Sequence, residues 1–137
     1  MTSHHMVRLD LHTDHRLRLT KEMYLKAILQ LSQEGNEVRP VDLVNCLGIT
    51  KGSVSEMLKN LEGDGFLHYQ SFKTIKLTPK GTLKAQLVLR KYHIIHSFLE
   101  KVLHMKGAKG HDQACNLEHV FSDDAILRLE RFLKERQ

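Results

Sequence analysis

The sequence has little of what stabilises secreted or membrane proteins. Its 137 residues include only two cysteines, Cys46 and Cys115, and they do not form the C-x-x-C pattern of a zinc site. No run of about 18 apolar residues could span a membrane, and no secretory hydrophobic segment stands near the start. These absences exclude a disulfide scaffold and predict a cytoplasmic protein with no membrane partner.

Length and composition set further bounds. A chain of 137 residues suits one domain or two small ones, and it is too short for a large doubly wound enzyme fold with a second domain. Hydrophobic residues make up 41%, which is enough for a folded core. The net charge of +5 is only mildly basic and by itself identifies no partner.

The charges are unevenly distributed. No acidic residue occurs from residue 65 to 99, where the chain carries a series of lysines and arginines. Such a segment predicts a positive face that could attract nucleic acid phosphates, although a solvated helix and hairpin would look the same. The basic residues are Lys73, Lys76, Lys80, Lys84, Arg90 and Lys91.

The first part of the chain has no apolar period. Residues 1–18 carry His4, His5, His12 and His15, and we expect a disordered or tag-like leader there. A metal-binding tail is the alternative, because short histidine-rich tracts can bind metals.

Residues 19–81 show the element order of a winged helix-turn-helix. Helix caps, glycines and short extended segments follow one another at the spacing of that motif. The predicted elements are a helix from Thr20 as N-cap to Gly35, a short helix over 41–47 between Pro40 and Gly48, a helix over 51–61 capped by Thr50, and two extended segments over 66–69 and 74–77.

Residues 82–137 are predicted to form a helical domain, so the fold is mainly α. A long helix begins at Thr78-Pro79, with Thr as cap and Pro in the first turn, and ends near residue 106. A helical region begins near His111, and Ser122 caps a last helix that reaches Leu133.

In a helix-turn-helix the second helix enters the major groove of double-stranded DNA with its N-terminal residues toward the bases. Lysines in that helix and in the wing would bind phosphates, whereas Ser53, Ser55 and Glu56 would carry any base discrimination. Use of the motif for protein contacts alone is the alternative. The predicted DNA-binding residues are Thr50, Lys51, Gly52, Ser53, Ser55, Glu56 and Lys59 in the helix and Lys73 and Lys76 in the wing.

Metal-ligating side chains gather between residues 111 and 119. On a helix, His111, Cys115, Glu118 and His119 would project from one face. A thiolate, a carboxylate and imidazoles on one face indicate a divalent transition-metal site. The alternative is a polar helix face with a structural cysteine.

Four short segments together resemble one known family. Their positions and order, around a winged helix, are similar to those of the diphtheria toxin repressor family of metal-dependent transcription regulators. The segments are 21–25 (KEMYL), 52–55 (GSVS), 77–81 (LTPKG) and 111–120 (HDQACNLEHV).

The resemblance implies a homodimer that binds a palindromic operator when loaded with metal and represses metal-uptake genes. By position, it implies a primary metal site of Met23, Cys115, Glu118 and His119. Manganese-sensing relatives carry carboxylates in place of Met23 and Cys115. Because sulfur donors favour iron(II) over manganese(II), iron is the expected effector, with manganese, cobalt, nickel or zinc as substitutes in vitro.

The resemblance also implies an ancillary metal site at Tyr92, His96 and His111. Tyr92 stands where the family usually has histidine, and His96 where it usually has glutamate. A neutral phenol is a poor ligand because it must first lose its proton. We therefore expect one tight ion per chain, with any second ion bound weakly. The alternative is that these two histidines only pack or form hydrogen bonds and bind no ion.

Longer members of the family carry a C-terminal SH3-like domain, whereas this sequence ends at Gln137, so we expect a short-form or truncated member. Three other functions stay open. They are a metal-independent winged-helix regulator, a manganese-responsive member of the same family, and a small metallo-hydrolase. The hydrolase is disfavoured because no separate motif supplies a base beside the metal cluster, and no enzymatic activity is expected.

Overall fold

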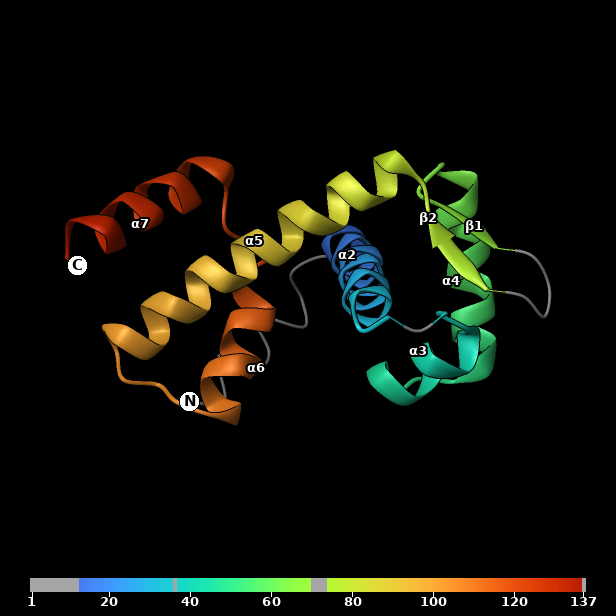
Figure 1. Ribbon diagram of the computed structural model, residues 1–137, viewed down its shortest axis with the longest axis horizontal. Coiled ribbons are helices and arrows are strands. Elements are labelled where there is room, and N and C mark those ends of the chain that lie inside the picture. The colour runs from blue at the N-terminus through green and yellow to red at the C-terminus, as the bar shows by residue number, and fades with distance from the viewer. Residues whose placement is uncertain (1–12, 36, 70–73, 137) are drawn as a thin grey trace. The chain divides into compact units, whose positions relative to one another are not determined.

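The computed structural model describes residues 13–35, 37–69 and 74–136. These described residues form two compact units, one ending at Thr82 and the other beginning at Leu83. None of the described helices is long and apolar enough to cross a membrane. The elements (Figure 1) are α2 (Thr13–Gln33), α3 (Pro40–Leu47), α4 (Lys51–Gly63), β1 (Leu67–Tyr69), β2 (Ile75–Leu77), α5 (Pro79–Lys101), α6 (Ala108–Leu117) and α7 (Asp123–Glu135).

Helix α2 begins at Thr13, so the predicted start at Thr20 is wrong. Residues 13–18 of the predicted disordered leader are helical, and residues 1–12 lie outside the described part of the chain. No glycine or proline occurs between Thr13 and Gln33. A helix already formed in its later turns can therefore extend toward the N-terminus at little cost.

The turn between α3 and α4 has the predicted caps. Gly48 ends α3 in the left-handed conformation, with φ of 66°, which a residue without a side chain adopts readily. The side-chain oxygen of Thr50 accepts a hydrogen bond from the backbone N–H of Ser53 at 3.1 Å and so caps α4. These local interactions produce the predicted helix-turn-helix.

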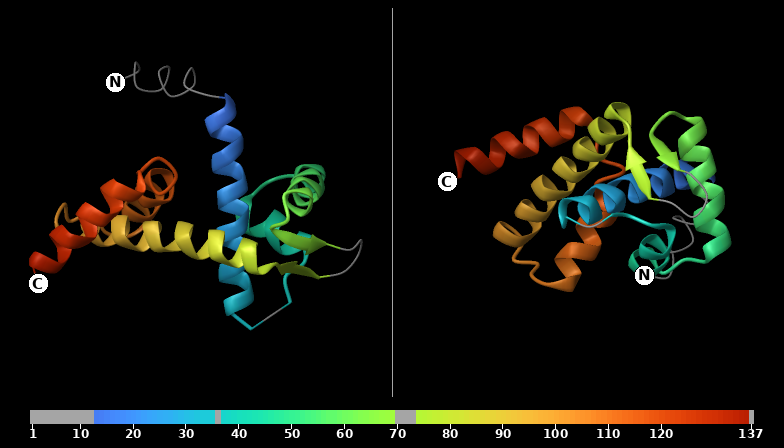
Figure 2. Two further views of the ribbon diagram at one scale, coloured as in Figure 1. Left: turned by 90° about the horizontal axis from the view of Figure 1, so that it is seen from above. Right: turned by 45° about the vertical axis from the view of Figure 1, so that its right-hand side comes forward.

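The two strands form the predicted hairpin (Figure 2). They pair antiparallel, with Leu67 opposite Leu77 and His68 opposite Lys76. Ile75 is buried and also pairs with Val38, so the segment before α3 adds an isolated bridge to the hairpin. This pairing fixes which face of the hairpin is buried.

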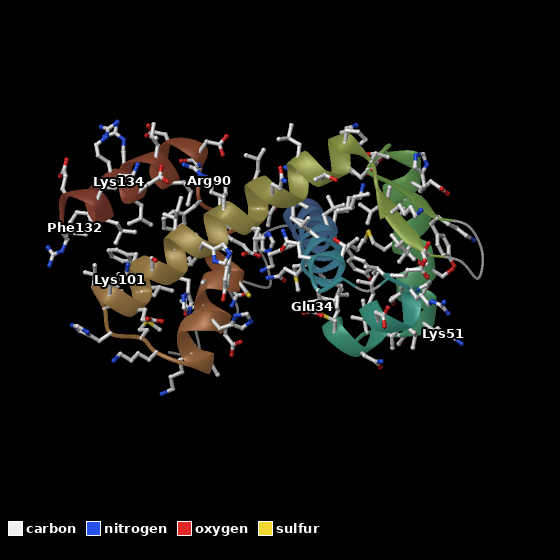
Figure 3. All side chains as sticks on the ribbon, viewed as in Figure 1. Glu34, Lys51, Arg90, Lys101, Phe132 and Lys134 are labelled. Atoms are coloured by element: carbon white, nitrogen blue, oxygen red, sulfur yellow. The ribbon has the colours of Figure 1, made fainter. Side chains whose placement is uncertain are left out.

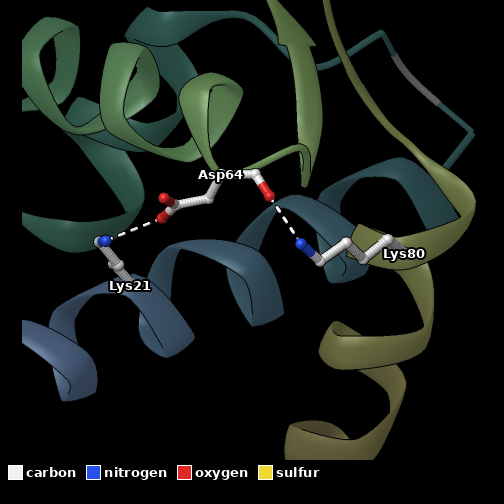
Figure 4. A network of polar contacts seen from close by, with 3 residues as sticks. All are labelled: Lys21, Asp64 and Lys80. Atoms are coloured by element: carbon white, nitrogen blue, oxygen red, sulfur yellow. Dashed lines mark hydrogen bonds and ion pairs between the residues drawn. The ribbon is translucent and has the colours of Figure 1, made fainter.

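Asp64, at the C-terminal end of α4, connects three elements of the first unit (Figure 4). Its carboxylate lies 2.8 Å from Lys21 Nζ of α2, and its carbonyl oxygen accepts a hydrogen bond from Lys80 Nζ of α5 at 2.8 Å. Gly81 packs so closely that a Cβ there would overlap the carbonyl oxygen of Phe66. The start of α5 is thereby held against the end of α4.

The second unit is built from most of α5 with α6 and α7. Its core consists of Ile94, Ile95, Leu99, Ala114 and Ile126. Helix α5 ends earlier than predicted, at Lys101, and α6 begins at Ala108 instead of near His111. Backbone turns with positive φ at His104 and Gly107, of 58° and 70°, separate the two helices.

Helix α7 begins where the sequence predicts. The hydroxyl of Ser122 accepts a hydrogen bond from the backbone N–H of Ala125 at 3.0 Å. Asp123 in the first turn lies 2.9 Å from Lys91 Nζ, and that cation lowers the pKa of the carboxyl group. A guanidinium nitrogen of Arg90 in α5 lies 2.6 Å from Glu130 Oε1 in α7, and this ion pair connects the two helices.

Candidate functional site

The first turns of α4 present the predicted DNA-binding side chains to solvent. Val54, Leu58 and Leu61 are fully buried on one face of this helix. The opposite face is exposed, and Figure 3 shows Lys51 at its start. Of the predicted residues on α4 and at its cap, only Ser55 is half-buried; Thr50, Lys51, Gly52, Ser53, Glu56 and Lys59 are exposed.

The hydroxyl of Thr50 is already engaged within the protein. It accepts the backbone N–H of Ser53 and donates to the Ser53 hydroxyl at 2.9 Å. Its main role in this structure is therefore to begin α4. In the wing, Lys76 is exposed on β2, whereas Lys73 lies outside the described residues.

The four metal-ligating residues between 111 and 119 make two separate contacts. Helix α6 ends at Leu117, Glu118 is its C-cap, and His119 follows in a turn. His119 Nε2 lies 3.1 Å from Glu118 Oε1, and the two side chains are 2% and 0% exposed. A buried carboxylate beside a buried imidazole is a combination that binds divalent transition ions.

Cys115 lies on α6 and contacts a different partner. Its Sγ is 3.6 Å from His111 Nε2, one helical turn earlier. Met23 belongs to α2 in the first unit and is 41% exposed. Within the part of the chain that the structure describes, no three His, Cys, Asp or Glu side chains come together as a metal site. The described contacts join Glu118 with His119 and, separately, Cys115 with His111.

The residues of the expected ancillary site surround Tyr92. Its hydroxyl lies 2.6 Å from His111 Nδ1, and its ring stacks on the His96 ring with the centroids 5.6 Å apart. The pKa of Tyr92 is raised, first by burial and then by the negative charges expected of Cys115 and Glu118. The phenol therefore keeps its proton at neutral pH, which makes Tyr92 a poor metal ligand.

The sequence reasoning missed one member of this group, Glu100. Its Oε2 lies 3.9 Å from His96 Nε2. The four-residue spacing on a helix was the available signal, because side chains at that spacing are neighbours.

The sequence matches two domain families, one over most of each unit. Residues 16–75 match "Iron dependent repressor, N-terminal DNA binding domain", and residues 78–137 match "Iron dependent repressor, metal binding and dimerisation domain". The chain is 33% identical over 116 residues to the diphtheria toxin repressor of Corynebacterium diphtheriae, an alignment that covers 85% of this chain and 51% of that protein.

The chain belongs to the diphtheria toxin repressor family. It spans about half the length of the first curated members that it matches. It is also 32% identical to an HTH-type transcriptional regulator of Methanocaldococcus jannaschii, with 83% of this chain and 92% of that one aligned.

A solved structure of similar sequence has the same fold. The manganese regulator SloR is 32% identical, with a TM-score of 0.75 over 83% of this chain and 53% of that one. The family's winged-helix DNA-binding domain and its metal-binding and dimerisation domain are thus both represented here. The paired donors Glu118 and His119 lie in the second of these domains.

Proposed function

We propose that this chain is a metal-dependent transcriptional repressor that binds double-stranded operator DNA as a homodimer, without enzymatic activity. The observation that carries the proposal is the buried pair Glu118 and His119. The pair offers two hard-to-borderline donors in the domain that matches the family's metal-binding region. The exposed N-terminus of α4 supplies the matching DNA-binding surface.

The proposed metal ligands are Met23, Cys115, Glu118 and His119. The bound ion would supply a positive charge that neutralises the carboxylate and thiolate and links the four donors. Met23 comes from one unit and the other three from the second, so metal affinity and the orientation of the DNA-binding unit would be thermodynamically coupled.

Iron(II) is the proposed physiological effector, because two of these ligands are sulfur atoms. Manganese(II) is the second candidate, since the similar solved structure is that of a manganese regulator. Cobalt(II), nickel(II) and zinc(II) are proposed to substitute in vitro, and tight zinc binding would not identify the effector, because zinc stands high in the affinity series.

On DNA, we propose that α4 enters the major groove and that the wing lies on the adjacent backbone. Lys51, Lys59 and Lys76 are exposed and would contact phosphates, and so would Lys73. Ser53, Ser55 and Glu56 would read base edges. A homodimer presents two such helices, which fits a palindromic operator, and we propose metal-uptake genes as the targets.

The second unit supports the homodimer. It carries most of the large hydrophobic side chains that are exposed among the described residues, and such side chains are enriched at protein interfaces. They are Leu83, Leu87, Leu103, Val120, Leu127 and Phe132.

Anaerobic titration tests the proposed function. Fluorescence anisotropy would follow binding to duplexes selected from a random pool, with iron(II), manganese(II) or no added ion. The proposal predicts tight binding only with an ion, two chains or a multiple of two per palindromic duplex, and a lower effective concentration for iron(II). Equal binding in the presence of a chelator would favour a metal-independent regulator, and preference for manganese(II) would overturn the iron assignment.

A further inference from the structure

Three side chains of the second unit form a chain of two polar contacts. Tyr92 of α5 lies 2.6 Å from His111 Nδ1 through its hydroxyl, and His111 Nε2 lies 3.6 Å from Cys115 Sγ. The first distance is short for a hydroxyl and a ring nitrogen, and the second is within the range of hydrogen bonds to sulfur. Both nitrogens of one imidazole are therefore engaged.

The proton positions depend on which group donates in the contact between Tyr92 and His111. A protonated phenol can donate or accept, and we assign it as the donor to His111 Nδ1. A neutral imidazole has one N–H, so acceptance at Nδ1 places that hydrogen on Nε2. In this assignment Nε2–H donates to the Cys115 sulfur, 3.6 Å away.

This arrangement leaves no suitable donor set for a second ion at Tyr92, His96 and His111. His111 Nδ1 is occupied by its contact with the Tyr92 hydroxyl at 2.6 Å, and a neutral phenol is a poor ligand. The His96 ring stacks on Tyr92, and its Nε2 lies 3.9 Å from Glu100. Metal binding here would require breaking the contact between Tyr92 and His111.

Helix packing keeps Tyr92 of α5 close to His111 of α6. Gly110, next to His111, lies so near the turn after α5 that a Cβ would overlap the carbonyl oxygen of Met105. The same Cβ position is 3.9 Å from His96 Nε2. The missing side chain lets the first turn of α6 approach α5, and His111 thereby reaches Tyr92.

We propose that Tyr92 and His111 are positioning residues that hold the Cys115 sulfur through an N–H···S hydrogen bond, and that they do not bind a second metal ion. This inference rests on the proposed function only in treating Cys115 as a metal ligand. Hydrogen bonds to ligand atoms fix ligand orientation and tune metal affinity. Tyr92 thus acts on Cys115 through His111.

A measurement on the metal-free full-length chain tests the hydrogen bonds alone. Histidine ¹⁵N NMR at about pH 8, where an ordinary imidazole is neutral, reports which ring nitrogen carries the proton. The His111 signal is assigned from its loss in His111→Gln. We expect the Nε2–H tautomer in the parent chain, a mixture of tautomers in Tyr92→Phe, and no change in the control Tyr69→Phe. The Nδ1–H tautomer in the parent, or no effect of Tyr92→Phe, would overturn the inference.

Cobalt(II) binding tests what the hydrogen bonds do. Under anaerobic equilibrium dialysis we expect one tightly bound cobalt(II) per chain, with a sulfur-to-metal charge-transfer band that Cys115→Ser removes. Tyr92→Phe and His111→Gln should shift this band and weaken binding roughly tenfold while the stoichiometry stays at one. A fall from two ions to one in His111→Gln would overturn the inference.

The two measurements separate this inference from the proposed function. If Cys115→Ser changed neither the cobalt(II) spectrum nor the affinity, the assignment of Cys115 as a ligand would fail. The tautomer result in the metal-free chain would still decide whether Tyr92 and His111 form the hydrogen bonds.

Discussion

Single side chains in this protein serve the fold and the proposed function together, and Thr50 illustrates the overlap. Its hydroxyl caps α4 through Ser53, although it stands among the predicted DNA contacts. Replacing a capping threonine by alanine usually costs about 1 kcal/mol of stability. A loss of DNA binding in Thr50→Ala would therefore not by itself identify a DNA contact.

We predict that Thr50→Ala lowers the free energy of unfolding by about 1 kcal/mol, because the first turn of α4 loses its cap. Urea unfolding measures the loss. Ser122→Ala removes the equivalent cap of α7 and is the matched control. It should lose a similar amount of stability and leave DNA affinity unchanged. Weaker DNA binding in Thr50→Ala with no loss of stability would instead indicate a direct contact.

Cys115→Ala tests the proposed metal site at the residue scale. We predict that the variant folds and dimerises but no longer binds DNA in response to metal, because a sulfur ligand is lost. Cys46→Ala removes the other cysteine, which is exposed on α3, and should behave as the parent chain. Anisotropy with added iron(II) measures the difference. Normal metal-induced binding by Cys115→Ala would refute the ligand assignment.

At the residue scale the sequence predicts a set of metal-ligating side chains, but it could not show how these side chains pair. The spacing of His111, Cys115, Glu118 and His119 indicated one shared face. In the structure α6 ends at Leu117 and His119 lies in the following turn, so the four residues do not all belong to one helix. The contact of His111 with Tyr92 depends on the packing of α6 against α5, which spacing alone could not show.

At the scale of elements, two close approaches position the functional parts. Gly81 sits against Phe66 where α5 follows the hairpin, and Gly110 sits against Met105 where α6 follows α5. In both places a Cβ would overlap a backbone carbonyl oxygen, so the backbone itself would have to move.

We predict that Gly110→Ala lowers the free energy of unfolding by about 1–3 kcal/mol, the usual range for overpacking. Lys109→Ala is the control, because this neighbouring α6 residue is exposed. Thermal unfolding followed by circular dichroism compares them. Because the shift would move His111 away from Tyr92, the His111 tautomer should change as well. Unchanged stability in Gly110→Ala would show that the close approach is not maintained in solution.

We predict that the wing and α4 have separable roles on DNA. Lys76→Ala should weaken binding to all duplexes similarly and reduce the slope of log affinity against log salt by about one unit, because one phosphate contact is lost. Lys73→Ala is expected to act in the same way. Lys101→Ala, at the exposed end of α5 (Figure 3), is the matched control with no expected effect.

Changes to the proposed base-reading side chains of α4 should alter selectivity instead of the salt slope. Ser53→Ala or Glu56→Ala is expected to change which duplexes are preferred, because these side chains would face base edges. Selection from a random pool with each variant measures this difference. An unchanged salt slope in Lys76→Ala would mean that the wing does not lie on DNA.

Among the elements, the sequence predicted those that local signals define. Thr50, Gly48 and Ser122 end or begin helices through short-range backbone and side-chain contacts, and such contacts are readable from sequence. The predicted starts of α2 and α6 were wrong. In α2 no residue interrupts the helix at Thr20, and α6 begins after Gly107 without a capping side chain.

At the scale of the whole molecule, the proposed DNA-binding residues and most of the proposed metal ligands belong to different units. The first carries the exposed face of α4 and the wing, and the second carries Glu118, His119 and Cys115. The proposed set of ligands draws Met23 from the first unit. We therefore propose that metal binding and DNA binding are coupled through this chain.

Coupling between two ligands is reciprocal. If the bound ion raises DNA affinity by some factor, bound DNA must raise metal affinity by the same factor. Iron(II) affinity of the full chain, measured anaerobically with and without a saturating selected duplex, tests this most directly. We predict a rise in iron(II) affinity of roughly 5- to 150-fold with DNA, the range of typical coupling energies, and no rise in Cys115→Ala. The same iron(II) affinity with and without DNA in the parent chain would show that the two binding events are not coupled.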